Sequence, residues 1–365
     1  MELIDTVTDT RMRSPKANAA QGAARAEYPV RDAQRIALLV LPEFSHLGLS
    51  FVVEIMALAN WLAQRPLYEW RIMSVDGKPV RATNGMHVPT EPVGQVDSRF
   101  SAVFVIASFD PKAHAKNRLL RTWLQRESRA GAQIIGVETG TELLAAAGLL
   151  DGHRAAVHWD NLEGFKEVYP KIRPAAELYT LDTRVATCAG AVAIVDLMLA
   201  WVGRSHGGAL TQELAQHLLH PAARASTHPQ LARSDPKPAA GGERIAAAIR
   251  IMRDNVSSPI PSQSLAARVG LSRRQFERQF KEQTGVSPHR YYVRIRVATA
   301  HRLLQQTDLS VSQIAVASGF ECLEHFSRIY KSRFGCAPSR DRRQSWEAPV
   351  MRQTQTPCDG GAASF

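Results

Sequence analysis

The sequence predicts a doubly wound α/β domain followed by an all-α domain built from two helix-turn-helix units. Three observations lead to this prediction. Short apolar runs alternate with helical patterns over residues 35–219, a proline-rich and glycine-rich stretch interrupts them at 221–242, and the segment from 261 to 343 repeats itself. Alternating strands and helices are typical of α/β folds with a parallel sheet. An internal repeat indicates a duplicated supersecondary unit.

The α/β domain is expected over residues 35–220. Its first strand, Arg35–Pro42, reads R-I-A-L-L-V-L-P, a continuous apolar run that fits the centre of a parallel sheet. Further strands are expected at Tyr68–Val75, Ala102–Ala107, Ala132–Val137 and Arg184–Cys188. Helices are expected at Phe44–Ala63, Pro111–Ala130, Thr141–Leu150, Ala191–Val202 and Gly207–Leu219.

Three other stretches lack an apolar period. Residues 1–34 are rich in Ala, Arg, Thr and Asp and are expected to be a disordered tail. Residues 221–242 contain P-A-A-R-A-S-T-H-P-Q and S-D-P-K-P-A-A-G-G, which is the composition of a linker. The second domain then covers residues 243–343, and residues 344–365 are expected to be a second disordered tail.

The two helix-turn-helix units run from Ser264 to Pro288 and from Gln313 to Pro338. A small residue, Ala266 or Ala315, allows the helices to cross closely, and Gly270 or Gly319 permits the tight turn between them. The units align through the pairs Leu265/Ile314, Ala266/Ala315, Gly270/Gly319, Phe276/Phe326, Arg278/Arg328, Phe280/Tyr330, Lys281/Lys331, Gly285/Gly335 and Pro288/Pro338. The second unit has one inserted residue after its turn glycine, and this insertion brings the later pairs into alignment.

The second helix of each unit is expected to read double-stranded DNA. Ser272 fits an N-cap, and the pairs Phe276/Phe280 and Phe326/Tyr330 form buried stripes. Side chains off these stripes would face the major groove. They are Arg273, Arg274, Glu277, Arg278 and Lys281 in the first unit, and Leu323, Glu324, His325, Arg328 and Lys331 in the second. Alternatively, several of these arginines only face the solvent and do not contact DNA.

The basic charge is confined to this domain. From Arg244 to Arg343 there are 18 Lys and Arg and 7 Asp and Glu, so the segment accounts for the whole net charge of +11. Such a concentration is what a phosphate-binding surface requires. Ser287–Gln306 is expected to form one long helix that joins the units rigidly. Two recognition helices held in this way fit major-groove segments about 34 Å apart.

Residues 243–343 resemble the AraC/XylS family of bacterial transcription regulators. The most specific match is G-F-x-x-x-x-H-F-S-R-x-Y-K-x-R-F-G-x-x-P, from Gly319 to Pro338. The resemblance implies that the outward residues of both recognition helices contact bases and phosphates of promoter DNA. It also implies a transcription regulator, more often an activator, that acts with RNA polymerase.

A second motif lies in the α/β domain, where a strand runs into G-V-E-T-G at Gly136–Gly140. This is the frame of a nucleophile elbow, a sharp strand-to-helix turn that presents its central residue at the carboxyl edge of the sheet. The central residue here is Glu138. A carboxylate lacks the nucleophilicity of a thiolate toward carbonyl groups.

Residues 35–219 resemble the class I glutamine amidotransferase-like (PfpI-like) superfamily, which has a flavodoxin-like fold. The match is closest to members fused to AraC-type domains, the GlxA type. Matching residues are Pro42–Ser45, the elbow, Ala145–Gly152 and Ala156–Trp159. The superfamily's enzymes have Cys at the elbow, His at His158 and often an acid at Gly48. This chain departs at Glu138 and Gly48, so we expect a catalytically inactive sensor with no catalytic residue.

The expected effector site consists of Glu138, Thr139, His158 and Trp159. Glu138 is expected to serve as counter-charge for an amine or quaternary ammonium ligand, with Trp159 or His158 nearby. The resemblance to GlxA-type members implies an effector that is an amine, betaine or amino acid. Alternatively, Glu138 only accepts backbone N–H groups at a helix start. Two other functions remain open: an active amidase or protease-like enzyme with a DNA-binding tail, and a sequence-blind DNA binder.

The four cysteines, Cys188, Cys322, Cys336 and Cys358, form no C-x-x-C pair or zinc spacing, so we expect no metal and no cofactor. Cys188 is expected to be a small buried residue. A reduced cytoplasmic location fits this usage. No segment is expected to span a membrane, and the resemblance implies a homodimer formed through the α/β domain.

Overall fold

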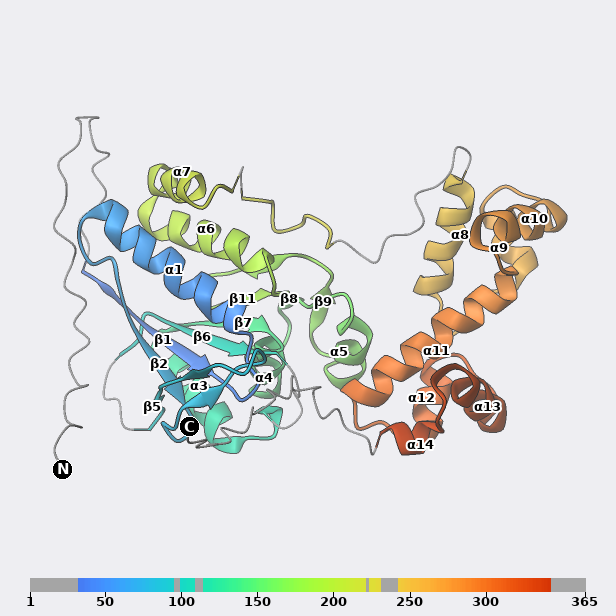
Figure 1. The fold of residues 1–365 in the computed structure, drawn as a ribbon, viewed down its shortest axis with the longest axis horizontal. Helices are drawn as coiled ribbons and strands as arrows, with labels where there is room; N and C mark the ends of the chain where they lie inside the picture. Colours follow the sequence, from blue (N-terminus) through green and yellow to red (C-terminus); the bar gives the residue numbers. More distant parts are fainter. Residues whose placement is uncertain (1–31, 95–98, 109–113, 221–222, 231–241, 343–365) are drawn as a thin grey trace, which may run out of the picture.

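The computed structural model describes residues 32–94, 99–108, 114–220, 223–230 and 242–342. Figure 1 shows an α/β domain and a helical domain, with α5 (Leu162–Val168) of the first beside the end of α11 (Pro288–Gln306) of the second. The two expected disordered tails lie outside the described residues, except for residues 32–34, and so does Cys358.

A seven-stranded sheet forms the centre of the α/β domain, in the order β10-β11-β7-β6-β1-β2-β5. Every neighbouring pair is parallel except β10 and β11. The strands are β1 Gln34–Val40, β2 Tyr68–Ser74, β5 Glu91–Pro92, β6 Ala102–Ala107, β7 Gln133–Glu138, β10 Tyr179–Leu181 and β11 Val185–Cys188. Two small sheets, β3 Val80–Arg81 with β4 His87–Val88 and β8 Arg154–Ala156 with β9 Arg173–Ala175, were not expected from the sequence.

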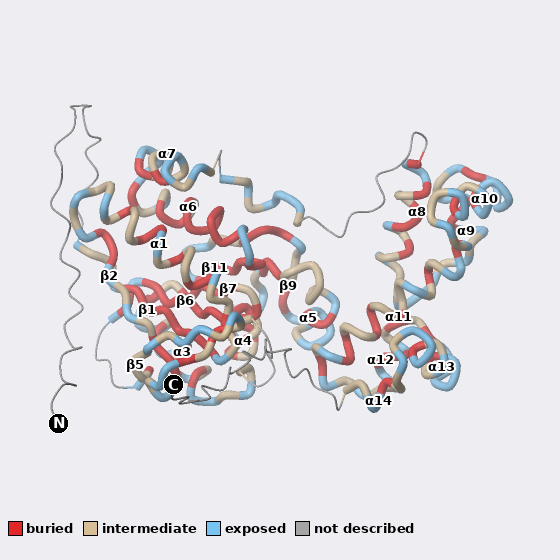
Figure 2. Tube along the Cα trace, in the orientation of Figure 1, coloured by how far each residue is buried: buried red, intermediate tan, exposed pale blue. Residues whose placement is uncertain are grey.

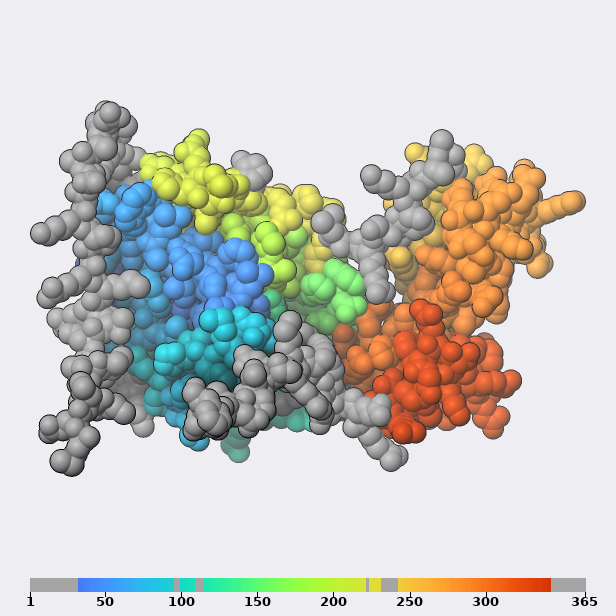
Figure 3. Space-filling view, in the orientation of Figure 1, coloured from blue at the N-terminus to red at the C-terminus, as the bar shows by residue number. Residues whose placement is uncertain are grey.

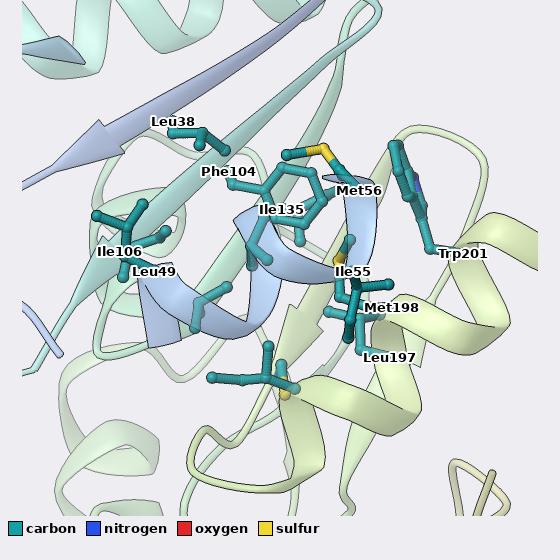
Figure 4. Packing of buried hydrophobic residues seen from close by; sticks show 14 of the residues in the cluster. Leu38, Leu49, Ile55, Met56, Phe104, Ile106, Ile135, Leu197, Met198 and Trp201 are labelled. Atoms are coloured by element: carbon teal, nitrogen blue, oxygen red, sulfur yellow. The ribbon is translucent and has the colours of Figure 1, made fainter. Parts of the chain in front are cut away.

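Helices cover both faces of this sheet, as expected for a doubly wound fold. One face carries α1 His46–Ala63, α6 Ala193–His206 and α7 Gly208–His217, and the other carries α3 Arg118–Arg129 and α4 Gly140–Ala146 (Figure 1). Each face has its own hydrophobic core, and the central strands are buried along their length (Figure 2). Figure 4 shows Met56 of α1 and Trp201 of α6 around Phe104 of β6.

The helix expected from Phe44 begins later, and the capping residues of α1 and α3 fix where these helices start. The Ser45 hydroxyl accepts the Gly48 N–H at 3.2 Å, so α1 starts at His46. The Asn117 side chain accepts the Leu120 N–H at 3.2 Å, so α3 starts at Arg118. The start expected at Pro111 falls within residues 109–113, outside the described part of the chain.

Length and composition alone do not exclude a membrane span for α1. Among the described residues it is the one helix long and apolar enough, with 18 residues and a mean hydropathy of 1.4. A buried core helix passes the same test. Val52, Ile55 and Met56 of α1 are fully buried in the core that α1 shares with α6 and α7.

Part of the expected linker is attached to the α/β domain. Residues 223–230, called the strap here, follow α7 and return along the domain. The Arg224 guanidinium lies 2.7 Å from the fully buried carboxylate of Asp196, and the Leu178 N–H bonds to the Ser226 carbonyl at 3.1 Å. Side-chain partners in the folded domain therefore override the linker-like composition over these eight residues.

The helical domain contains seven described helices: α8 Glu243–Asp254, α9 Ser262–Arg268, α10 Arg273–Thr284, α11 Pro288–Gln306, α12 Val311–Ala317, α13 Leu323–Phe334 and α14 Pro338–Asp341. Two hydrophobic cores lie within it. Tyr292 of α11 belongs to the first core, and Val297, Leu303 and Leu304 belong to the second. The prediction of one continuous helix joining both units is therefore confirmed, because α11 is built into both cores.

Candidate DNA-binding and effector-binding sites

The first recognition helix, α10, begins at a capping box. The Ser272 hydroxyl accepts the Gln275 N–H at 3.3 Å, and the Gln275 side chain accepts the Ser272 N–H at 3.1 Å. This confirms the expected N-cap, although the role of Gln275 went unnoticed in the S-x-x-Q pattern. Phe276 and Phe280 are fully buried, so the opposite face of α10 is left for solvent.

All five outward residues expected on α10 are exposed, and so are all five on α13. The Phe326 and Tyr330 stripe of α13 is fully buried, which fixes its rotation in the same way as in α10. Figure 1 shows both helices on the side of the helical domain away from the α/β domain. Within the α10 row, Arg273 is paired with Glu277 at 2.9 Å, an arrangement that orients both side chains.

A residue that the sequence did not single out, Arg296 of α11, holds the turn of the second unit. Its guanidinium donates to the carbonyl groups of Ser318 at 3.0 Å and Gly319 at 2.5 Å, and stacks 4.0 Å above the Phe320 ring. Burial lowers the pKa of this guanidinium from its ordinary value. Arg244 makes a weaker equivalent contact to the Gly270 carbonyl at 3.4 Å in the first unit.

The elbow forms as expected. Glu138 takes the strained conformation, with a φ of 54°, at the end of β7. An added Cβ would lie 2.8 Å from Thr141 Cα at Gly136, and 2.0 Å from the Val105 carbonyl oxygen at Gly140. The glycines are therefore needed for space, because α4 and β6 pass directly beside them.

The Glu138 side chain is buried where three chain segments meet. Burial raises its pKa, and hydrogen bonds with Ser108, Ser45 and the Ala191 backbone act in the opposite direction. Gly190, which precedes Ala191, has no room for a side chain, because an added Cβ would lie 2.1 Å from Glu138 Cγ. The carboxyl group thus accepts a backbone N–H, as the alternative interpretation required, but from the segment after β11 and not from the start of α4.

Thr139 and His158 lie in constrained surroundings. The Thr139 hydroxyl donates to the Ser108 carbonyl at 2.8 Å. His158 Nδ1 accepts the Asp160 N–H at 3.3 Å, which leaves the proton on Nε2. Burial lowers the pKa of His158, while the charge of Asp160 raises it. The His158 and Trp159 rings lie 5.2 Å apart.

The structure does not join the two halves of the expected effector site by hydrogen bonds. Among the described residues, neither His158 nor Trp159 bonds to Glu138 or Thr139. Residues 109–113, which follow Ser108, lie outside the described part. Two residues that sequence reasoning missed, Ser45 and Ser108, contact Glu138 instead. Of these two, only Ser45 could have been found from the sequence, because it lies in the matching segment Pro42–Ser45.

Cys188 and Gly48 offer no reactive group in this structure. Cys188 is a small buried residue as expected, and burial raises the pKa of its thiol to about 12. An added Cβ at Gly48 would lie 3.3 Å from Ile194 Cδ1, so this position has little room. Within the described ranges, no three His, Cys, Asp or Glu side chains are grouped so that they could hold a metal ion.

Comparison with known proteins covers both domains. A family model described as a helix-turn-helix domain matches residues 265–344. The chain is 36% identical over 304 residues to the HTH-type transcriptional regulator CdhR of Pseudomonas aeruginosa, which is 83% of this chain and 90% of that protein. It is 32% identical over 315 residues to the HTH-type transcriptional regulator GlxA of Rhizobium meliloti, covering 86% of this chain and 97% of the relative.

The fold of the α/β domain has a counterpart among solved structures. A THiJ/PfpI family protein from Pseudomonas syringae superposes with a TM-score of 0.51 at 20% identity, over 66% of this chain and 94% of that one. The predicted fold class, flavodoxin-like α/β followed by helix-turn-helix, is therefore confirmed. Because both curated relatives align along the two domains, the chain belongs to the AraC family of HTH-type transcriptional regulators.

Proposed function

We propose that this regulator binds a small cationic or zwitterionic effector beside the elbow, without turning it over. The observation that carries the proposal is Glu138. A strained backbone holds a carboxyl group where the superfamily's enzymes have a nucleophile, and three segments of the domain converge on it. Strain of this kind is concentrated at functional sites.

Two properties argue against catalysis. Among the described residues, no hydrogen bond joins the Glu138 carboxyl group to the His158 imidazole, as a base–nucleophile pair would need. The Cys188 thiol is fully buried and its pKa is raised, so no thiolate is available there. The domain therefore acts as a sensor in this proposal.

The proposed effector class rests on the charge of Glu138, on the Trp159 ring and on what the resemblance to GlxA-type regulators implies. Glu138 offers a counter-charge to an ammonium group, and Trp159, beside His158, offers a ring face to its methyl groups. Amines, betaines and amino acids carry such groups. Thr139 completes the proposed set.

A thermal-shift screen of amines, betaines and amino acids on the full chain tests this proposal. An effector at a hundred times its Kd should stabilise the protein by about 2.7 kcal/mol, and Glu138→Ala should abolish the shift. A shift that survives Glu138→Ala would refute the counter-charge role. Product formation that depends on His158 would favour the amidase or protease alternative instead.

The ten exposed residues of α10 and α13 are the proposed DNA contacts. We further propose that the protein activates transcription with RNA polymerase, works in the cytoplasm, does not associate with membranes and forms a homodimer through the α/β domain. Sedimentation of the purified chain tests the last point, since a monomer at micromolar concentration would contradict it.

A further inference from the structure

One turn belongs to the proposed effector site and also contacts the helical domain. It comprises residues 158–161 and is called the His158–Asn161 turn here. The Asn161 N–H bonds to the His158 carbonyl at 2.8 Å, and the Asp160 N–H bonds to the imidazole at 3.3 Å. Backbone and imidazole are thus tied together, so a displacement of the ring moves the whole turn.

The far side of this turn contacts the last turn of α11. The Gln306 amide donates to Asn161 Oδ1 at 2.7 Å and to the Asp160 carbonyl at 3.3 Å. Arg302 lies 3.7 Å from the Asp160 carboxylate. The next helix, α5 Leu162–Val168, packs here too, because an added Cβ at Gly164 would lie 2.8 Å from Gln306 Oε1. Figure 3 shows the green surface of α5 meeting the orange surface of the helical domain.

The near side of the turn is held by the strap. The Gln230 side chain accepts the Trp159 N–H at 2.8 Å and donates to the carbonyl groups of Val157 at 2.9 Å and Glu177 at 2.6 Å. Gln230 and Gln306 therefore hold the same short turn through different groups. Both are described residues far from it in the sequence.

We propose that the His158–Asn161 turn couples the effector site to the orientation of the helical domain through Gln306. The inference rests on the proposed function, because His158 and Trp159 are assigned there to the effector. Since α11 is built into both helix-turn-helix cores, a shift of its last turn reaches both recognition helices.

The contact is suited to opening. Within the described part of the chain, Gln306 Oε1 is buried without a hydrogen-bond partner. A buried unsatisfied acceptor offsets part of what the two amide bonds contribute. A second interdomain ion pair, Lys116 with Asp308 at 2.9 Å, is exposed on both sides and adds little. Docked and undocked arrangements are therefore close enough in free energy for a ligand to shift between them.

The test uses the reciprocity of coupling, so no effector is needed. Hydrogen exchange is measured on the full chain with and without the DNA duplex that the wild-type protein selects from a randomised pool. DNA should change the amide exchange rates of residues 157–161 about fivefold or more. Gln306→Ala should abolish that change, whereas Gln305→Ala should retain it. Gln305 is the matched control because its amide contacts His301 within α11.

Asn161→Ala removes the same hydrogen bond from the other side and should behave like Gln306→Ala, so a folding defect in one variant leaves the test intact. The proposal is overturned if DNA leaves the turn unchanged in the wild type, or if the change persists in both variants. Protection of α10 and α13 in the same experiment reports DNA binding separately. Failure of the effector proposal would appear only in the thermal-shift screen.

Discussion

Glu138 occupies a position where backbone strain and burial act on one carboxyl group. Its left-handed conformation lies between two glycines, Gly136 and Gly140, that have no room for a side chain. The G-x-E-x-G string was enough to predict the elbow. It was not enough to predict the partners of the side chain, because Ser108 and Ala191 lie far away in the sequence.

Burial should make the stability contribution of Glu138 depend on pH. Its pKa is raised from the ordinary value of 4.5, so the folded protein binds this proton more tightly than the unfolded chain does. The contribution therefore grows as the pH falls through the raised pKa and stops growing below 4.5. Relative to Glu138→Gln, the wild type should gain about 1.4 kcal/mol on acidification for each tenfold difference in proton affinity. Urea unfolding across this range measures it, and parallel pH profiles would contradict it.

Arg296 is expected to stabilise the second unit. Arg296→Ala removes two hydrogen bonds and a cation–π contact, and should lower the free energy of unfolding by about 2 kcal/mol. Arg296→Lys should recover only part of this, because an ammonium cannot reproduce the planar fork. Urea denaturation checks both variants. Arg294→Ala, at an exposed site on the same helix, should lower the free energy of unfolding by less than about 0.5 kcal/mol. If Arg294→Ala lowers it as much as Arg296→Ala does, the contacts of Arg296 do not explain the effect.

At the scale of elements, the helical domain was the most predictable part of the chain. Its turn glycines and aromatic stripes act within one unit, and the repeat displays each of them twice, whereas the Ser272 cap of α10 has no side-chain counterpart in α13. The helix α5, the small sheets and the attachment of the strap were missed. They depend on partners in other elements, such as Asp196 for Arg224, and short elements carry little periodic signal.

The recognition helices should lose affinity when their outward arginines are removed. Arg274→Ala in α10 and Arg328→Ala in α13 should each weaken binding to the selected duplex by about 1–3 kcal/mol if they contact bases. If they contact phosphates, each should reduce the salt slope by about 0.9. Fluorescence anisotropy over a salt series distinguishes the two. Arg129→Ala, an exposed arginine of α3, is the charge-matched control and should leave both quantities unchanged.

At the scale of the whole molecule, the strap matters because it ends the α/β domain. Arg224→Ala would leave the fully buried Asp196 carboxylate with His220 and one backbone N–H as its partners among the described residues. We expect the free energy of unfolding of the α/β domain to fall by about 3 kcal/mol. Calorimetry on the full chain should show this domain's transition lowered and that of the helical domain unmoved. Equal shifts of both transitions would mean that the strap stabilises more than its own domain.

The strap also limits how far the helical domain can travel. Between Gln230 and Gly242 there are eleven residues, which at full extension reach about 40 Å. After the Gln306 bonds open, the released domain remains tethered within that radius, and its effective concentration for re-docking is of millimolar order. A contact far too weak to hold two separate proteins together can therefore be well populated within one chain. Lengthening this tether with glycine and serine would reduce the population of the docked arrangement without changing any residue in the contact.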